Sequence, residues 1–355
     1  MAEIGIMKGK ILFITGSLNQ TSQMHQIAQQ LPDYDCWFSQ FFTDWALPNA
    51  LIKYTKLLDN TIAAGRFKLN SEAYLTSNNL QIDYRGLKNA YDLVVFCTDL
   101  HVPKQFHSTK KVFVQEGMTD KYTVVSKIVK TLSLPAALTG DTSLNGSTNM
   151  CDVYCVASEG YKKHFTALGT NAGKIIVTGM PNYDYAEQHL ENNFPHHNYV
   201  MVATTDLRET FRKEDRPAFI QESVKIANGR KLLFKLHPNE NFARAVAEIC
   251  EHAPNDSIVY QAGNTNHMIA NCAELITQYS TVVYVGMALG KKVYSYFDME
   301  KLKQLQPIQN GGMSAFNIAQ VCRNYIEFNE IHPVQKNPYY ELMRVLKGLV
   351  MADNF

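Results

Sequence analysis

The clearest chemical signal in the sequence is a histidine followed by a proline at the end of an apolar run. In the segment FKLHPNE, His237 and Pro238 come directly after the strand-like residues RKLLFKL. Proline fixes its own backbone and biases the preceding residue towards an extended conformation. The imidazole of His237 would therefore project from the edge of a sheet, where it could donate to a phosphate or a ribose hydroxyl. The alternative is a histidine that caps the next helix or bonds a neighbouring loop.

A second signal is a pair of hydroxyl residues between a strand and a helix. The segment ELITQYS predicts a strand that ends near Tyr279, and TVVYVGMALG predicts a helix closed by Gly290 in the C′ position. Free N–H groups and hydroxyls where this helix begins, at Ser280 and Thr281, could bind an anion. An ordinary serine cap is the alternative. Because the carboxyl ends of parallel strands share one sheet edge, this pair and His237 together predict a nucleotide-phosphate site.

An acidic residue follows another apolar run. In VFVQEGMTD, Glu116 precedes Gly117, at which the backbone can turn sharply. A carboxylate at the end of a strand, in a crevice between two domains, is a candidate general base for an acceptor hydroxyl. Asp120 is a weaker candidate for the same role. The alternative for Glu116 is an ion pair on a surface loop.

Two other loops contain small or polar residues. Gly16, Ser17 and Asn19 follow the first predicted strand and could line the acceptor side of the crevice, although the G-x-G-x-x-G dinucleotide fingerprint is absent. An ordinary strand-to-helix loop is an equal alternative. In VTGMPNYD, Gly179 and Pro181 are expected to set a hinge angle, and the backbone of Gly179 could approach the donor.

Neither metal chemistry nor a nucleophilic triad finds support. The sequence contains no H-E-x-x-H, Asp-x-Asp or G-x-S-x-G motif. The histidines at 101, 107, 196 and 197 are predicted to lie in solvated loops. We therefore expect no metal and no cofactor other than the substrate.

The elements that must position these residues alternate along the chain. Strands are predicted in the first half at Lys10–Thr15, Cys36–Phe42, Tyr91–Asp99, Lys110–Gly117 and Cys151–Ser158 and in GKIIVTG, with helices at Ser22–Gln30, Asn49–Ala64 and Glu159–Leu168. Continuous apolar runs such as LVVF are typical of a parallel sheet covered on both faces. The alternation indicates a doubly wound α/β domain.

The composition changes after Pro181. The polar segment NYDYAEQHLENNFPHHN indicates a linker near residues 182–198, and a second strand–helix alternation follows it. We therefore predict an α/β protein with two Rossmann-like domains that face each other across a cleft. The first is placed at residues 1–185 and the second at 195–330. An amphipathic helix at 331–355 is expected to pack back across both domains, with a membrane surface as the alternative.

The overall composition excludes several classes of protein. The 355 residues include 34 Lys and Arg against 33 Asp and Glu, so the net charge of +1 argues against binding to nucleic acid through bulk charge. Hydrophobic residues make up 46%, which excludes global disorder. No apolar run is long enough to span a membrane, and no signal peptide is expected. The seven scattered cysteines are expected to be reduced thiols of a cytoplasmic protein.

Several of these segments resemble the glycosyltransferase GT-B superfamily, whose members have two Rossmann-like domains. KIIVTGMPNYD is similar to the vtGnPryD motif of CDP-glycerol glycerophosphotransferases and UDP-GlcNAc 2-epimerases. KLHPNE resembles their KlHP strand, and LITQYSTVVYVGMALGKKV resembles lItdySSvvfeamalgkPV. With VFVQEGMTD added, the set also resembles bacterial CMP-sugar transferases, which include sialyltransferases and Kdo transferases.

The resemblance implies roles for individual residues. Glu116 would match the acidic general base, His237 the histidine that contacts the donor phosphate, and Ser280 with Thr281 the phosphate-binding pair. The chain also departs from each branch. Gln115 stands where sialyltransferases carry another acidic residue, CDP-glycerol enzymes have histidine at the position of Glu116, and the epimerases carry Asp-Ser-Gly-Gly in place of the YSTV segment.

Together these features predict an inverting, metal-independent glycosyltransferase of bacterial surface polysaccharide synthesis. CMP-, CDP- and UDP-activated donors all fit, with a CMP-sugar favoured, and the acceptor would be a hydroxyl of a glycan or a lipid-linked glycan. A lipid-linked acceptor would bring a cytoplasmic enzyme to the inner membrane. One alternative is a UDP-GlcNAc 2-epimerase-like enzyme, which needs no acceptor. The other is a non-catalytic subunit that binds a sugar nucleotide.

Overall fold

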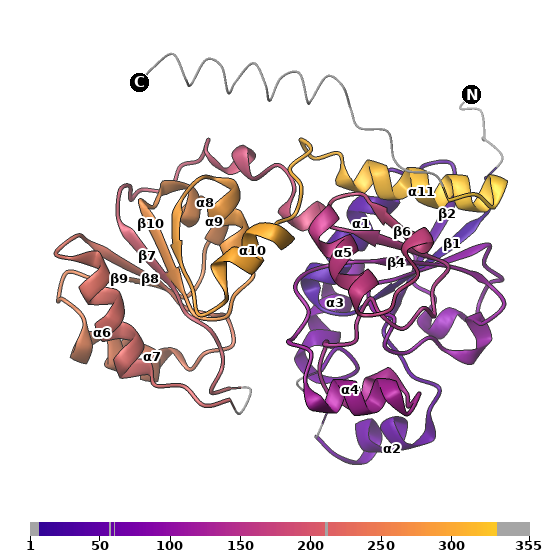
Figure 1. Ribbon diagram of the computed structural model, residues 1–355, viewed down its shortest axis with the longest axis horizontal. Helices are drawn as coiled ribbons and strands as arrows, with labels where there is room; N and C mark the ends of the chain where they lie inside the picture. Colours follow the sequence, from indigo (N-terminus) through magenta and orange to yellow (C-terminus); the bar gives the residue numbers. More distant parts are fainter. Residues whose placement is uncertain (1–6, 57, 60, 210–211, 332–355) are drawn as a thin grey trace. The chain divides into compact units, whose positions relative to one another are not determined.

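The computed structural model describes residues 7–56, 58–59, 61–209 and 212–331 (Figure 1). The chain divides at Asp184 and Asn310 into two compact units, the second of which is Tyr185–Gln309. This division differs from the expected second domain, which ran to residue 330. The segment after Asn310 belongs to the first unit because helix α11 (Ser314–Phe328) packs on the first sheet. The helix expected at 331–355 lies, from residue 332 on, outside the described residues.

The first unit is built on a six-stranded parallel sheet in the order β2-β1-β3-β4-β5-β6. Its strands are β1 (Lys10–Thr15), β2 (Asp35–Gln40), β3 (Leu93–Phe96), β4 (Lys110–Val114), β5 (Val153–Val156) and β6 (Ile175–Val177). Its other helices are α1 (Leu18–Ala28), α2 (Ala46–Tyr54), α3 (Gly65–Ser77), α4 (Val124–Thr131) and α5 (Glu159–Ala167). β3 and β5 are buried along their whole length, as the continuous apolar runs predict.

Several predicted bounds differ from the structure for local reasons. Helix α1 begins at Leu18, before the predicted start at Ser22, because Ser17 already caps it. Helix α2 ends at Tyr54, well before the predicted end at Ala64. The sequence interpretation included no helix at the positions of α3, α4 and α11.

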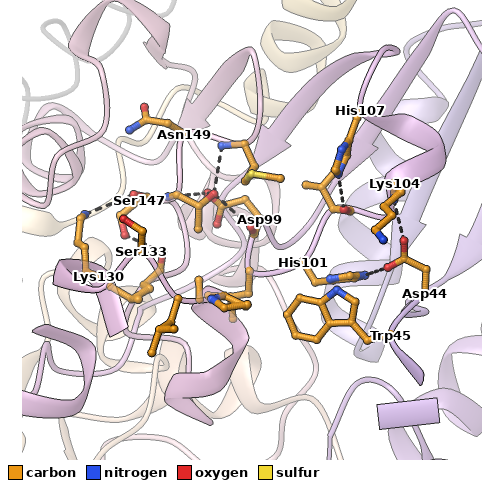
Figure 2. A pocket seen from close by; sticks show the side chains of 18 residues that line it. Asp44, Trp45, Asp99, His101, Lys104, His107, Lys130, Ser133, Ser147 and Asn149 are labelled. Atoms are coloured by element: carbon orange, nitrogen blue, oxygen red, sulfur yellow. Dashed lines mark hydrogen bonds and ion pairs between the residues drawn. The ribbon is translucent and has the colours of Figure 1, made fainter. Parts of the chain in front are cut away.

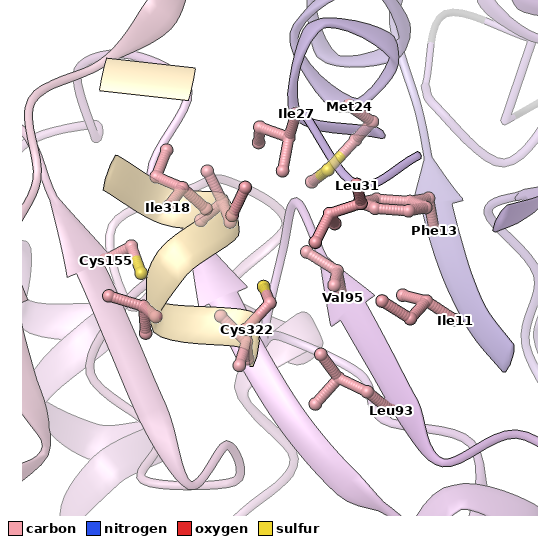
Figure 3. Close-up of a cluster of buried hydrophobic side chains, with 14 of the residues drawn as sticks. Ile11, Phe13, Met24, Ile27, Leu31, Leu93, Val95, Cys155, Ile318 and Cys322 are labelled. Atoms are coloured by element: carbon pink, nitrogen blue, oxygen red, sulfur yellow. The ribbon is translucent and has the colours of Figure 1, made fainter. Parts of the chain in front are cut away.

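One face of the first sheet forms a core with α1 and α11 (Figure 3). Alternate strand residues such as Phe13 and Val95 point to this face. Met24 and Ile27 from α1 and Ile318 from α11 cover them, and all five side chains are buried. A helix that follows the second unit in sequence therefore completes the core of the first.

The second unit contains a five-stranded parallel sheet in the order β11-β10-β7-β8-β9. Its strands are β7 (Val200–Ala203), β8 (Leu232–Lys235), β9 (Ile258–Tyr260), β10 (Glu274–Thr277) and β11 (Lys292–Tyr294). Its helices are α6 (Arg216–Ala227), α7 (Phe242–His252), α8 (Thr265–Asn271), α9 (Val283–Ala288) and α10 (Met299–Leu305).

The strand orders identify where each sheet could bind a ligand. The order reverses between β1 and β3 in the first unit and between β7 and β10 in the second. In open α/β sheets, ligands bind at such switch points, outside the carboxyl ends of the strands. Each unit can therefore be searched at one defined edge.

Candidate functional site

In the first unit, the turn between β1 and α1 is shaped by a capping box. Ser17 N donates to Gln20 Oε1 at 2.7 Å, and Ser17 Oγ accepts from Gln20 N at 3.4 Å. A Cβ atom on Gly16 would collide with Gln20 Oε1, so glycine is required for this arrangement. Gln20 is thereby held at the end of β1, beside the switch point.

Glu116 meets this turn from the end of β4. Its side chain is partly exposed and forms a hydrogen bond with the side chain of Gln20. Burial raises the pKa of Glu116 to about 7, and the hydrogen bond from Gln20 offsets part of the rise. Within the described residues no basic side chain pairs with Glu116, so the alternative of a surface ion pair does not apply. The structure thus brings together two predicted loops, those of Ser17 and Glu116.

Gln115 occupies the position at which sialyltransferases carry another acidic residue, and its contacts require an amide. The Gln115 side chain is 2% exposed. Its Nε2 donates to Gly117 O at 2.9 Å, and its Oε1 accepts from Ala157 N at 2.9 Å. A carboxylate could not donate the first of these bonds. The amide therefore fixes the loop that carries Glu116 to β5.

The remaining first-unit predictions have mainly structural contacts. Asn19 is exposed, and its carbonyl accepts from Asn182 Nδ2 at 2.8 Å. Gly179 has φ +82°, and a Cβ there would collide with Ser314 Oγ at the start of α11. The glycine is thus explained by close packing within the first unit. Roles of Asn19 at an acceptor and of Gly179 at a donor stay predictions.

In the second unit, the loops of His237 and Ser280 are joined through the end of β7. His237 N donates to Thr204 Oγ1 at 3.2 Å, and Thr205 Oγ1 donates to Gln278 Oε1 at 2.9 Å. Thr204 and Thr205 follow β7, which lies between β8 and β10 in the sheet. The two signals expected at one sheet edge therefore do meet there, although their roles towards a ligand stay predictions.

The imidazole of His237 has one nitrogen available for a ligand. Its Nδ1 lies 3.3 Å from Asn239 N and 3.5 Å from Asp206 Oδ2. When Nδ1 accepts from Asn239 N, a neutral imidazole carries its proton on Nε2. Nε2 forms no hydrogen bond within the described residues. The side chain is 36% exposed, so this N–H could donate to a phosphate.

The structure corrects the predicted start of the helix after β10. Helix α9 begins at Val283, and Val282 occupies its N-cap position without a side-chain hydrogen bond. Ser280 is therefore not the cap; it and Thr281 lie in the preceding turn, where Tyr284 N donates to Thr281 O. A helix of only six residues has a small dipole, so a phosphate would depend on the hydroxyls themselves. The exposed ring of Tyr279 contacts Tyr296 and Phe297.

A buried network of charged side chains connects the loops at the carboxyl edge of the second sheet. Arg216, 1% exposed, lies 2.9 Å from Glu214 Oε1 through Nε and 2.5 Å from Glu240 Oε1 through Nη2. It also donates to Thr205 O at 2.9 Å. Glu240 in turn accepts from His237 N at 2.7 Å and from Thr204 Oγ1. One guanidinium thus ties the loop after β7 to the HPNE turn.

The first unit also holds a cavity of about 480 Å³ that Glu116 does not line (Figure 2). Asp99 in its wall is fully buried and accepts from Gly146 N at 2.6 Å and from Tyr154 Oη at 2.9 Å. His101 Nε2 lies 2.9 Å from Asp44 Oδ1. The prediction of a solvated loop is wrong for His101, which is buried, and this burial lowers its pKa.

The described part of the chain contains neither a candidate metal cluster nor a candidate membrane-spanning helix. Among those residues, no group of three or more His, Cys, Asp or Glu side chains is placed to hold a metal ion. No helix within the described ranges has the length and apolar character needed to cross a membrane. All seven cysteines lie in the described part and are free.

No protein-family model and no curated protein matches the sequence. Solved structures do match. The co-structure of S. aureus MnaA with UDP has a TM-score of 0.55 at 11% identity, covering 92% of this chain and 100% of that chain. A UDP-N-acetylglucosamine 2-epimerase from Rickettsia bellii has a TM-score of 0.52 at 9% identity, covering 90% and 97%. A Listeria monocytogenes protein, provisionally assigned as the same epimerase, has a TM-score of 0.56 at 11% identity, covering 92% and 99%.

The chain has the GT-B fold. This confirms the fold class that the motifs predict, with two parallel α/β units. Identities near 10% extend the likeness to the fold and not to the substrate. A preference for a CMP-sugar gains no support from these structures.

The sequence interpretation did not include the residues that fix the loops within each edge. Gln20 could have been found, because Ser17 followed three positions later by glutamine is a capping-box pattern. Glu240 stands three residues after His237 but gives no comparable signal. Arg216 lies in a different element, and its contacts with Glu240 and Thr205 depend on the tertiary fold.

Proposed function

We propose that the chain is an enzyme that acts on a nucleotide-activated sugar, and specifically a glycosyltransferase. The observation that carries this proposal is Glu116, a carboxylate with a pKa of about 7 at the carboxyl end of β4. A general base works best when its pKa is close to the operating pH. Burial without a counter-ion gives Glu116 that property at the edge where this fold binds ligands.

In the proposed reaction, Glu116 of the first unit is the general base, and the phosphate-binding groups belong to the second unit. The acceptor hydroxyl attacks the anomeric carbon from the face opposite the nucleotide, and Glu116 takes the hydroxyl proton. The new C–O bond forms as the bond to the phosphate oxygen breaks, so the configuration inverts. The leaving phosphate keeps the electron pair, and His237 Nε2 with the hydroxyls of Ser280 and Thr281 stabilises its charge without a metal.

A nucleoside diphosphate is the first donor class to test. Support comes from the fold likeness to S. aureus MnaA, whose co-structure contains UDP. CMP-sugars stay in the test because of the motif resemblance. The acceptor in this proposal is a hydroxyl of a glycan or of a lipid-linked glycan, as in surface polysaccharide synthesis.

A UDP-GlcNAc 2-epimerase is the second candidate. It is favoured by the matched structures from Rickettsia bellii and Listeria monocytogenes. An epimerase also needs a proton-transfer group, so Glu116 fits either reaction. The two reactions differ in one respect that can be observed directly, because only the epimerase converts its nucleotide sugar without an acceptor.

The test begins with binding and ends with product analysis. Thermal shifts with CMP, CDP, UDP and GDP identify the nucleotide, since a ligand that binds only the folded state raises its melting temperature. The matching nucleotide sugars are then incubated with the protein alone and with glycan acceptors. Transfer that requires an acceptor supports the glycosyltransferase, and conversion of UDP-GlcNAc alone identifies an epimerase. If no nucleotide shifts the melting temperature, the proposal is wrong.

A further inference from the structure

Helix α4 in the first unit exposes apolar residues on the face that points away from the core. Its inward face carries two buried residues, Val129 and Ser126, and Ser126 shares a hydrogen bond of 2.7 Å with Ser143 Oγ. Its outward face carries Val124, Val125 and Ile128, and Val124 is 74% exposed. An ordinary surface helix places its apolar residues inward. The outward face of α4 therefore needs an explanation other than the packing of this unit.

The apolar surface continues beyond the helix. Leu132, Leu134 and Leu138 follow α4 and are all exposed, Leu132 by 63%. Isolated exposed leucines are common, but a run of apolar side chains on one helix and the segment after it is characteristic of an interaction site.

Helix α2 adds a second apolar element at the same end of the unit. None of its residues is buried, and Leu47 and Tyr54 are 70% and 74% exposed. Trp45, its N-cap residue, lines the same cavity as Lys130 of α4 and Leu134 (Figure 2). The two helices therefore lie around one cavity. We call the exposed apolar residues of α2, α4 and the segment up to Leu138 the α2–α4 surface.

The charged side chains within the two segments of this surface are all lysines. Residues 46–56 and 121–140 contain no Asp or Glu, whereas Lys53, Lys121 and Lys127 are all exposed. The three acids closest to the two segments each have a partner. Asp44, before α2, lies 2.9 Å from His101 Nε2, and Asp120 and Asp141 accept hydrogen bonds from Thr142 and Ser143. Exposed apolar side chains with lysines and without acids match the chemistry of an anionic lipid surface.

We propose that the α2–α4 surface binds the face of a bilayer that contains anionic lipids. Val125, Ile128 and Leu132 enter the boundary between headgroups and acyl chains, and the lysines remain at the level of the phosphates. This inference does not depend on the reaction at Glu116, because it rests only on exposure and charge of the first unit.

The test is flotation of the full chain with vesicles. Vesicles of equal parts phosphatidylcholine and phosphatidylglycerol are expected to carry the protein, whereas pure phosphatidylcholine vesicles and high salt reduce binding. The double variant Ile128→Ser/Leu132→Ser is expected to weaken binding at least about tenfold. The matched control is Leu190→Ser/Phe328→Ser, which removes two exposed apolar side chains elsewhere and leaves binding unchanged.

Several outcomes would overturn the proposal. Equal binding of the Ile128/Leu132 variant and the original protein, or no binding of the original protein to anionic vesicles, shows that the surface is not a membrane site. A change in molar mass of the variant by light scattering assigns the surface to a second copy of the chain. A change in the UDP thermal shift of the variant assigns it to the substrate site. Vesicle binding with no response to any nucleotide keeps this proposal and removes the proposed function.

Discussion

The carboxyl edges of the two sheets differ in whether their charged side chains have a counter-ion. At the first edge, Glu116 has an amide partner in Gln20 and no counter-ion among the described residues, so burial raises its pKa to about 7. At the second edge, the buried guanidinium of Arg216 is paired with two glutamates, Glu214 and Glu240. A partly buried carboxylate without a counter-ion changes its protonation easily, whereas oppositely charged groups that pair with one another hold their neighbours in place.

This difference suggests a division of labour between the edges. A group that must exchange a proton works best when its protonated and ionised states have similar free energies. A site that must hold a phosphate benefits instead from loops that do not move, with the donor groups at their surface. His237 fits the second description, since its backbone N–H is bonded to Thr204 and Glu240 while its side chain is 36% exposed.

The largest expected effect comes from breaking the first edge. Glu116→Gln keeps the shape of the side chain and removes its ability to accept a proton. We expect turnover to fall by about 10²–10⁴-fold, the usual contribution of a general base. The UDP-induced thermal shift should change little, because the proposed phosphate groups belong to the second unit. Measurement of kcat for the variant decides this, and wild-type turnover would show that Glu116 is not the base.

The second expected effect concerns the buried network. Arg216→Met leaves Glu240 buried without its cation, whereas Glu214 keeps Arg208 Nε at 3.1 Å. The free energy of unfolding is expected to fall by about 3–5 kcal/mol. Arg230→Met is the matched control, because the Arg230–Glu274 pair is largely solvent-exposed on the arginine side and should contribute no more than about 1 kcal/mol. Urea unfolding of both variants measures the difference. Similar losses in the two would mean that the network does not hold the second edge.

The two edges also show which features could be predicted from the sequence and which could not. Apolar runs located the strands, and the order of elements predicted that the loops of His237 and Ser280 share one edge. The cap of α9 was misplaced because Ser280, two positions before the N-cap residue Val282, resembles a true cap in sequence. Arg216 could not be assigned, since a buried arginine and an exposed one have the same local pattern.

The same limit applies to the first unit. The sequence interpretation included no helix at the position of α11, and it placed these residues in the second domain by chain order alone, whereas α11 packs on the first sheet. His101 was interpreted as solvated because it stands in a loop, whereas Trp45 and Asp44 enclose it. Contacts between segments far apart in sequence decide both cases.

The third prediction tests whether His237 acts through the ligand or through the loop. His237→Ala removes the Nε2 donor but keeps the backbone N–H that is bonded to Thr204 and Glu240. A hydrogen bond to a charged phosphate contributes about 1.5–3 kcal/mol, so the Kd for UDP should rise about 10–100-fold. Calorimetric titration measures it. His252→Ala, a histidine at the end of α7, serves as the control, and an equal effect there would exclude a direct contact for His237.

The smallest expected effect is the pH dependence of stability that Glu116 imposes. Its pKa is about 7 in the folded protein and near 4.5 when unfolded, so the folded state holds the proton more tightly. This contribution to stability is fully present below about pH 4.5 and is lost as the pH rises through 7. Glu116→Gln removes the loss, so the variant should exceed the original protein in free energy of unfolding at pH 8, by about 1–3 kcal/mol at 1.4 kcal/mol per pKa unit.

At pH 5 the variant and the original protein should differ little, since Glu116 is then mostly protonated in the folded state and resembles glutamine in charge. Urea unfolding at both pH values measures the two differences. Glu191→Gln, which changes an exposed carboxylate in the second unit, should show no such dependence. A difference for Glu116→Gln that is the same at pH 5 and pH 8 would mean that the carboxylate is ionised throughout this range. The pKa of Glu116 would then not be raised, and the electrostatic contrast between the two edges would disappear.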